Sequence, residues 1–371
     1  MKIAYFNGTL KVEDGVTRVI LAFVREMHAL GHECVIVTGH AEDRSITNAP
    51  IFEVPSISIP FYKEYKIPLP GMKGFEKVLN EFKPDIIHVH SPETGSWAAL
   101  KYARKNNIPI VATHHTDFAG RMRFYHMSFL EPLVWKLLRR LYLKMDILTT
   151  PSEVSMLDLH KHKILNAETQ MWGVDFENFD KKYRSENWRK SIAENDEKII
   201  LHVSRIAWEK ELKILTEAYN VLRRNRSDFK MVVVGDGPAK NDLMLLMPGA
   251  IFLGHLDGRM LSEVYSSSDI LLFPSSTETF GNVTVEAIAS GIVPVVANAG
   301  GSKSIVSDGE NGLLAVPGDV NDFVKKVEIL LDDSALYKKL QKNGNNFIKD
   351  FSWEKVNKKF VDIYENLIKN K

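Results

Sequence analysis

The chain has almost no cysteine and no long apolar run. One cysteine among 371 residues, Cys34, cannot form a disulfide within the chain, so a disulfide-stapled secreted scaffold is excluded. The apolar residues around it favour a small core side chain over a nucleophile. No apolar run approaches the roughly 18 residues that span a bilayer, and no signal peptide precedes the strand-like start. We therefore expect a cytoplasmic protein.

An excess of charge of one sign is also missing. The chain has 48 Lys and Arg against 47 Asp and Glu, a formal net charge of +1, which gives no global case for nucleic-acid binding. The glycine fingerprint G-x-G-x-x-G is absent after the first predicted strand, where the sequence reads N-G-T-L-K-V-E-D-G. This absence argues against a dehydrogenase.

The pattern of apolar residues predicts an α/β fold with two domains. The length suggests two domains at roughly 150 residues each. The first half opens with a strand over 2–7, a helix over 16–30 and a strand over 33–38. The second half opens with a strand over 198–204 and a helix from Glu209. In such βα units ligands bind at the carboxyl ends of the strands.

The stretch from Ser275 to Glu286 predicts a phosphate site. An apolar strand ends at Pro274, a short polar loop follows, and a helix is expected over 283–290. Unpaired backbone N–H groups at the helix start favour phosphate, and Glu278 and Glu286 flank them. This arrangement suits a sugar joined to a nucleoside diphosphate. The alternative is a helix start with acidic residues favoured by the helix dipole.

This stretch, E-T-F-G-N-V-T-V-E, resembles the signature of retaining glycosyltransferases of family 4, which have the GT-B fold of two Rossmann-like domains facing a central cleft. Within this family, the sequence most resembles the diacylglycerol glycosyltransferases and the GDP-mannose-dependent mannosyltransferases. The resemblance implies that the first glutamate and the loop hold the donor sugar and phosphate, while the second glutamate holds the ribose. The implied donor residues are Glu278, Phe280, Gly281, Asn282, Val283 and Glu286.

Two cations stand between a predicted strand end and a helix in the second half. Arg205 can bind a diphosphate with forked hydrogen bonds and Lys210 as a point charge. The surrounding R-I-A-W-E-K is similar to a motif of the same family, and no D-x-D metal motif occurs anywhere in the chain. We therefore expect a reaction without metal or cofactor, with these two cations in the metal's role. The alternative is a pair of exposed residues at a helix end.

The resemblance implies two further donor contacts. Gly15 would face the donor diphosphate, although a plain turn glycine is the alternative. Leu253 belongs to a short strand, Ile251 to Gly254, whose backbone would pair with the nucleobase. The sequence does not choose between guanine and uracil.

A histidine pair follows the strand predicted over 108–113, in the sequence T-H-H-T-D-F. Histidine exchanges protons near neutral pH, and a strand's carboxyl end is a ligand side. A metal site is the alternative, but no further His or Cys cluster completes a ligand set. H-T-D-F resembles the family's F-H-T-D-F, which implies that His115 faces the donor sugar and Asp117 the acceptor. His114 stands at an aromatic position of the family, so which histidine faces the donor stays open.

The segment from Arg121 to Lys144 carries six basic residues against one acidic residue, interleaved with aromatic and aliphatic side chains. Such a helix can lie on an anionic membrane surface. The alternative is a buried helix face with solvated arginines. Its place in the family, beside the acceptor pocket, implies acceptor contacts by Arg121 and Arg123 and a lipid or lipid-linked glycan as acceptor.

We expect residues 1–175, with a returning helix over 353–371, to bind the acceptor, and residues 176–352 to bind the nucleotide sugar. The expected reaction moves a hexose from a GDP- or UDP-sugar with retention of configuration. The departing phosphate would take the acceptor proton, and Glu278 would orient the sugar. Two alternatives remain: an epimerase, which consumes donor without acceptor, and a non-catalytic sensor, which binds donor and releases no nucleotide.

Overall fold

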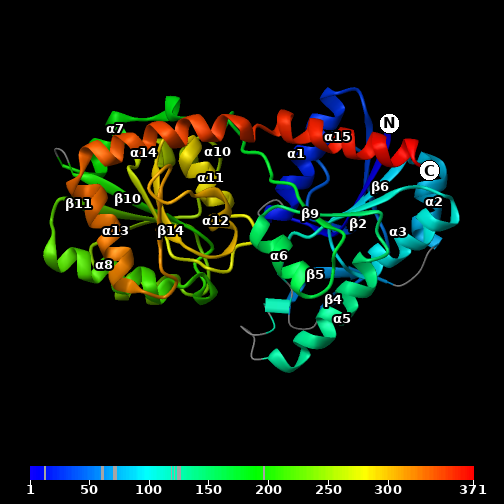
Figure 1. Cartoon of the computed structure of the whole chain (residues 1–371), viewed down its shortest axis with the longest axis horizontal. Coiled ribbons are helices and arrows are strands. Elements are labelled where there is room, and N and C mark those ends of the chain that lie inside the picture. The colour runs from blue at the N-terminus through cyan, green and yellow to red at the C-terminus, as the bar shows by residue number, and fades with distance from the viewer. Residues whose placement is uncertain are drawn as a thin grey trace. The chain divides into compact units, whose positions relative to one another are not determined.

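A computed structural model describes residues 1–11, 14–59, 62–69, 73–117, 119–120, 122, 127–194 and 197–371. The chain divides into two compact units, one of Met1–Trp172 with Trp353–Lys371 and the other of Gly173–Ser352. The break after Trp172 lies close to the boundary predicted at residue 175. In each unit, helices lie on both sides of the strands (Figure 1). No helix in the described ranges is long and apolar enough to cross a bilayer.

The first unit contains a seven-stranded parallel sheet in the order β3-β2-β1-β6-β7-β8-β9. Its strands are β1 (Lys2–Leu10), β2 (Glu33–Ala41), β3 (Ile51–Glu53), β6 (Ile86–Val89), β7 (Ile110–Thr113), β8 (Ile147–Thr150) and β9 (Ala167–Thr169). A small antiparallel pair, β4 (Ser56–Ile59) and β5 (Tyr62–Pro68), forms a separate sheet that contacts the end of β1 through Thr9 and Lys66. The helices are α1 (Gly15–Ala29), α2 (Lys73–Phe82), α3 (Thr94–Lys105), α5 (Glu131–Tyr142), α6 (Glu153–Lys161) and α15 (Trp353–Lys369), with the short η1 (Ser128–Leu130) before α5.

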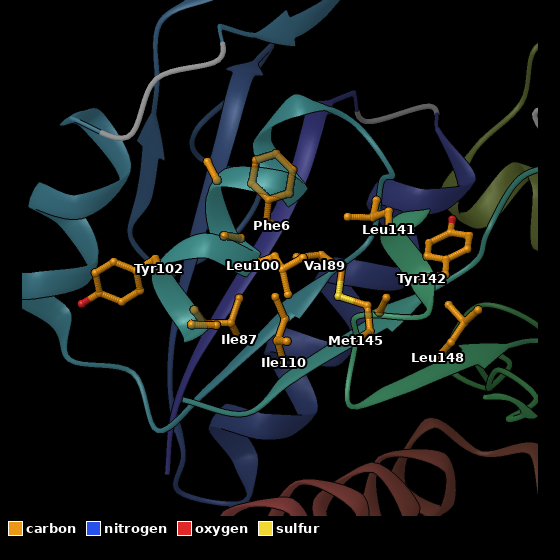
Figure 2. Close-up of a cluster of buried hydrophobic side chains, with 14 of the residues drawn as sticks. Phe6, Ile87, Val89, Leu100, Tyr102, Ile110, Leu141, Tyr142, Met145 and Leu148 are labelled. Carbon is orange, nitrogen blue, oxygen red and sulfur yellow. The ribbon is translucent and has the colours of Figure 1, made fainter. Parts of the chain in front are cut away.

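One face of this sheet is covered by apolar side chains of α2, α3, α5 and α6. Val89 and Ile110 from neighbouring strands meet Leu100 of α3 and Leu141 of α5 in this core (Figure 2). Near-continuous apolar strands such as I-I-H-V fit a parallel sheet that is buried on both faces. The core therefore holds the carboxyl ends of the strands in fixed positions.

The second unit contains a six-stranded parallel sheet in the order β12-β11-β10-β13-β14-β15. The strands are β10 (Lys198–Val203), β11 (Phe229–Val234), β12 (Ile251–Gly254), β13 (Ile270–Phe273), β14 (Val293–Ala297) and β15 (Leu313–Ala315). Numbered from the first strand of the unit, this order is that of the Rossmann fold. The strand order reverses between β10 and β13, and ligands of such sheets bind at the carboxyl ends beside that reversal.

The helices of the second unit flank this sheet. They are α7 (Glu186–Ile192), α8 (Leu212–Asn225), α9 (Lys240–Leu246), α10 (Gly258–Ser267), α11 (Asn282–Ala289), α12 (Gly300–Ile305), α13 (Val320–Asp332) and α14 (Ser334–Phe347), with short helices η2 (Lys181–Tyr183), η3 (Trp208–Lys210) and η4 (Ile348–Phe351). The polar segment between residue 176 and β10 contains η2 and α7. Arg189 anchors α7 to the sheet because its guanidinium donates to the Ser267 carbonyl at 2.6 Å and to Asp269 at 2.9 Å.

The helix expected to start at Glu209 begins later. Residues 208–210 form η3, Glu211 adopts a left-handed conformation with φ of 55°, and α8 begins at Leu212. Glu211 breaks the helical path, so η3 and α8 are separate elements. Lys210 is consequently the last residue of a short loop helix, not part of a long helix.

Candidate active site

The loops that follow β10 and β13 lie side by side because these two strands are hydrogen-bonded neighbours. Ile200 pairs with Ile270 and Leu201 with Leu271, both in parallel register. Both loops therefore start at the same side of the sheet, at the carboxyl ends of the two strands between which the strand order reverses. The first loop carries the basic residues singled out in the sequence, and the second carries the first glutamate of the signature.

Lys210 and Glu278 form an ion pair at this edge. Lys210 Nζ lies 2.5 Å from Glu278 Oε1, and the two side chains are 23% and 21% exposed. Ser275 Oγ donates to the same carboxylate oxygen at 3.4 Å. An ammonium has three hydrogen-bond donors, and one is used by Glu278, so the others can contact an anion. The pair is accessible enough to meet a ligand and ordered enough to position it.

Arg205 takes a different partner. Its guanidinium pairs with Glu209, four residues on, and its side chain is 52% exposed. Arg205 therefore lies in the same loop as Lys210 without contacting Glu278 in any described hydrogen bond or ion pair. The loop itself is fixed by the glycine turn after β11, where the Ile206 N–H donates to the Asp236 carbonyl at 2.8 Å.

The signature loop ends in a helix start with no side-chain cap. Gly281 is the N-cap of α11, with φ of 95°, and as a glycine it has no side chain to cap the first turn. The first backbone N–H groups of a helix need partners, and an anion is one of them. A second loop supports this one, since the Gly301 N–H donates to the Glu278 carbonyl at 2.6 Å.

The remaining donor residues predicted in the second unit fall into two groups. Phe280 is 1% exposed, so its ring is core and only its backbone is available to a donor. Asn282 and Val283 are half-buried in the first turn of α11. Glu286 lies one turn further along, where Tyr265 OH donates to its carboxylate at 2.8 Å. Leu253 is half-buried in the edge strand β12.

Two predicted contacts of the first unit lie at helix starts. Gly15 is the half-buried first residue of α1, and the carboxylate of Asp14 accepts from the Thr17 N–H at 3.3 Å. Asp117 accepts from the Gly120 N–H at 2.7 Å. Arg121 and Arg123 lie outside the described residues.

The two histidines after β7 have different surroundings. His115 Nε2 lies 2.7 Å from His90 Nδ1, and its ring stacks on Trp172 with centroids 4.8 Å apart. His114 Nδ1 lies 3.1 Å from Tyr142 OH, under α5. Burial lowers the pKa of His115 well below its ordinary value, and burial lowers the pKa of His114 to about 4. Both imidazoles are therefore neutral at pH 7.

A second histidine pair was not singled out in the sequence. His88 and His90 lie two residues apart at the end of β6, so both rings are on one side of the sheet. His88 bonds Tyr364 OH at 2.6 Å and Thr113 Oγ1 at 2.7 Å. Among the described residues no three His, Cys, Asp or Glu side chains are arranged to hold a metal ion. The H-V-H spacing in the sequence places both histidine rings on the same side of a strand, but it does not reveal the contact of His90 with His115.

The comparisons with known proteins agree with this geometry. Residues 14–172 match the model described as Glycosyltransferase Family 4, and residues 184–347 match Glycosyl transferases group 1. The chain is similar to a GDP-mannose-dependent alpha-mannosyltransferase of Corynebacterium glutamicum, at 32% identity over 96% of this chain and 86% of that protein. It is also similar to sulfoquinovosyl transferase SQD2 of Arabidopsis thaliana, at 33% identity over 89% of this chain and 66% of that protein.

Similarity extends to a lipid-modifying enzyme and to solved structures. An alpha-monoglucosyldiacylglycerol synthase of Acholeplasma laidlawii is 26% identical over 99% of this chain and 98% of its own. The structure of sucrose-phosphate synthase from Thermosynechococcus elongatus superposes with a TM-score of 0.81 at 19% identity, covering all of both chains. The chain therefore belongs to the glycosyltransferases that these two family models describe, which have the GT-B fold and use nucleotide sugars.

Proposed function

We propose that this protein is a retaining hexosyltransferase that moves a hexose from a GDP- or UDP-sugar to a hydroxyl group of a lipid or lipid-linked glycan, without a metal ion. The observation that carries the proposal is the ion pair of Lys210 with Glu278, at the strand reversal of a Rossmann sheet. The ion pair brings together the motif proposed to bind the donor's diphosphate, which contains Lys210, and the motif proposed to bind its sugar, which contains Glu278.

The leaving diphosphate is stabilised by fixed positive charge. As the bond between sugar and phosphate breaks, negative charge develops on the phosphate oxygens. Lys210 and the uncapped start of α11 are already ordered, so they stabilise this charge without first reorganising. Arg205, half exposed in the same loop, exchanges Glu209 for a phosphate oxygen when the donor binds.

Retention follows if the acceptor hydroxyl attacks from the side that the diphosphate leaves. A departing phosphate oxygen then accepts the acceptor's proton, so no separate carboxylate base is needed. Glu278 is held by Lys210 and Ser275, which favours orienting the sugar hydroxyls over attack as a nucleophile. His115, neutral and fixed by His90, exchanges hydrogen bonds with the hexose.

A lipid acceptor is supported by the surface of η1 and α5. Phe129, Leu133 and Leu137 are 76%, 52% and 52% exposed and recur every four residues, so they form one apolar stripe. Lys136, Arg139, Arg140 and Lys144 are the basic residues of the same segment. An exposed apolar stripe with basic neighbours suits an anionic membrane surface, where a lipid acceptor would be found. We name these three apolar and four basic residues together the α5 surface.

The names of the relatives fit the same substrates. One relative is named for GDP-mannose and another for diacylglycerol. The proposal takes from them a nucleoside diphosphate hexose as donor and a glycerolipid as the first acceptor to try.

The test is a screen for nucleoside diphosphate release. The purified protein is incubated in EDTA with UDP-glucose, UDP-galactose, GDP-mannose or GDP-glucose, with and without diacylglycerol or phosphatidylinositol in mixed micelles. The expected result is acceptor-dependent release from one donor class, with an α-linked glycolipid as product. Donor consumption without acceptor would indicate an epimerase, and binding without release under every condition would indicate a sensor.

A further inference from the structure

A pocket lies in the second unit, at the amino ends of the strands, opposite the donor motifs. It has a volume of about 460 Å³, and its lining includes Asp269, directly before β13, and Ser290, directly after α11. The signature loop follows the other end of β13, and its Gly281 is the N-cap of α11. The pocket and the donor motifs are therefore at opposite ends of the same strand and the same helix. Pockets for small molecules are typically about 300–1,000 Å³.

The charge of this lining is positive. Lys181 and Arg184 lie on it, and Asp269 is its one acidic residue. The Asp269 carboxylate is already neutralised, because it accepts from Arg189 at 2.9 Å and from the Ile199 N–H at 2.8 Å. No side-chain partner of Lys181 exists among the described residues, and Arg184 uses only Nε to bind Glu186, at 2.7 Å. Two cationic groups are thus available to an anion.

Neutral polar groups complete the lining. Ser290 is 2% exposed, and its hydroxyl has no hydrogen-bond partner among the described residues. A buried hydroxyl without a partner is costly, and a ligand oxygen would remove that cost. Gln341 donates to the Gly291 carbonyl at 2.7 Å, and Asn345, one turn along α14, also faces the pocket. An anion alone would use the two cations and leave the Ser290 hydroxyl without a partner.

We propose that this pocket is a second ligand site that binds a hexose phosphate, with the phosphate on Lys181 and Arg184 and the sugar hydroxyls on Ser290 and Asn345. The chemistry of the lining requires both parts of such a ligand. The two cations favour a phosphate, and the buried Ser290 hydroxyl, with Asn345 on the same lining, favours a polyol beside it. The site is separate from the one that holds the nucleotide sugar under the proposed function.

Isothermal titration tests the proposal on the whole chain. The probes are glucose 6-phosphate, mannose 6-phosphate, glucose and inorganic phosphate, each titrated with and without saturating GDP or UDP. We expect at least one hexose phosphate to bind tenfold or more tightly than either fragment, with an affinity that nucleotide does not change. Equal binding of inorganic phosphate, loss of binding when nucleotide is present, or no binding of any probe would overturn it.

Variants locate the site. The double change Lys181→Ala and Arg184→Ala should weaken the hexose phosphate by roughly 100-fold, since a hydrogen bond to a charged group contributes about 1.5–3 kcal/mol. Asn345→Leu, which keeps the side-chain size, should weaken it about tenfold. Lys190→Ala, an exposed lysine of α7 outside the lining, is the matched control and should bind as the parent does. Thermal melting confirms that each variant is folded, and unchanged affinity in the folded double variant would contradict the proposal.

Discussion

Lys210 Nζ lies 2.5 Å from Glu278 Oε1, although the two residues are 68 positions apart in the chain. They meet because β10 and β13 are adjacent, and each residue lies in the loop that follows its strand. A cation and a carboxylate in contact at the strand reversal can bind the two parts of a nucleotide sugar, its phosphate and its hydroxyls.

Lys210→Ala should lower kcat by roughly 10² to 10³ while the fold is kept, because one preorganised charge on the leaving group is lost. Steady-state kinetics with the preferred donor measure this. Lys213→Ala is the matched control, since Lys213 is a lysine of α8 whose side chain is 80% exposed. A folded Lys210→Ala variant with turnover near that of the control would refute the assignment of Lys210.

Glu286→Gln should raise the donor KM about tenfold or more and change kcat less. A carboxylate that binds the ribose hydroxyls stabilises the bound donor equally in the ground state and in the transition state, so its loss affects KM more than kcat. A hydrogen bond to a charged group contributes about 1.5–3 kcal/mol to the free energy of binding. Tyr265→Phe removes the hydroxyl that donates to Glu286 at 2.8 Å, so it should give a smaller change of the same kind. A drop in kcat at constant KM in both variants would contradict a ribose role.

Gly281→Ala should reduce kcat/KM at least tenfold. Gly281 has φ of +95°, and an added Cβ would lie 2.6 Å from Ser302 Oγ, which would displace the start of α11. Gly309→Ala is the control, because Gly309 has φ of +72° and nothing lies within 4 Å of its added Cβ. Both variants should lose about 1–2 kcal/mol of stability from the left-handed backbone, but only the first should lose activity. Equal activities would show that the position of α11 is not critical.

Stability should fall as the pH drops below about 6.5. Burial lowers the pKa values of His88, His90 and His115 well below 6.5 in the folded state, and burial lowers that of His114 to about 4. The unfolded chain then binds more protons than the native chain, so the free energy of unfolding decreases toward acid. The slope per histidine is about 1.4 kcal/mol per pH unit.

Urea unfolding between pH 7.5 and 5 measures this slope. Above pH 7 these histidines should contribute no pH dependence, because they are neutral in both states. His114→Phe should reduce the slope by the contribution of one histidine. A free energy of unfolding that is constant from pH 7 to 5 would contradict neutral buried histidines.

Leu133→Ser with Leu137→Ser should weaken binding to phosphatidylglycerol vesicles at least tenfold, because burying a leucine contributes roughly 1.5–3 kcal/mol. Vesicle sedimentation measures this, with phosphatidylcholine vesicles as the uncharged comparison. Leu245→Ser is the control, since Leu245 is 81% exposed on α9 and outside the α5 surface. An equal loss in the control, or no affinity of the parent for anionic vesicles, would contradict a membrane role for the α5 surface.

Local sequence signals were sufficient for the α/β fold and for the strand–loop–helix around Glu278. Pro274 ends an apolar run that is strand β13, and Glu286 lies one turn into α11. These features depend on residues close in sequence, where strand, turn and helix preferences act. The strand order and the contact between Lys210 and Glu278 are not local features, and only the resemblance to a family gave both residues a role at the donor.

Long-range contacts and backbone conformations were not predictable in this way. The left-handed Glu211 carries no glycine or asparagine signal, so η3 and α8 read as one helix. His90 meets His115 only because β6 and β7 are neighbours, and the Phe280 backbone lies against Gly301 of a loop far along the chain. Pairings of this kind depend on tertiary packing, which local patterns do not encode.

The central claim is that Arg205, Lys210 and the start of α11 hold the donor diphosphate without a metal ion. Calorimetric titration of GDP and UDP in EDTA, with the parent and with the Arg205→Ala, Lys210→Ala double variant, tests it most directly. The account predicts that one nucleotide binds the parent in EDTA and binds the folded double variant at least 100-fold more weakly. Nucleotide binding that requires added Mg²⁺, or that is equal in parent and double variant, would contradict it.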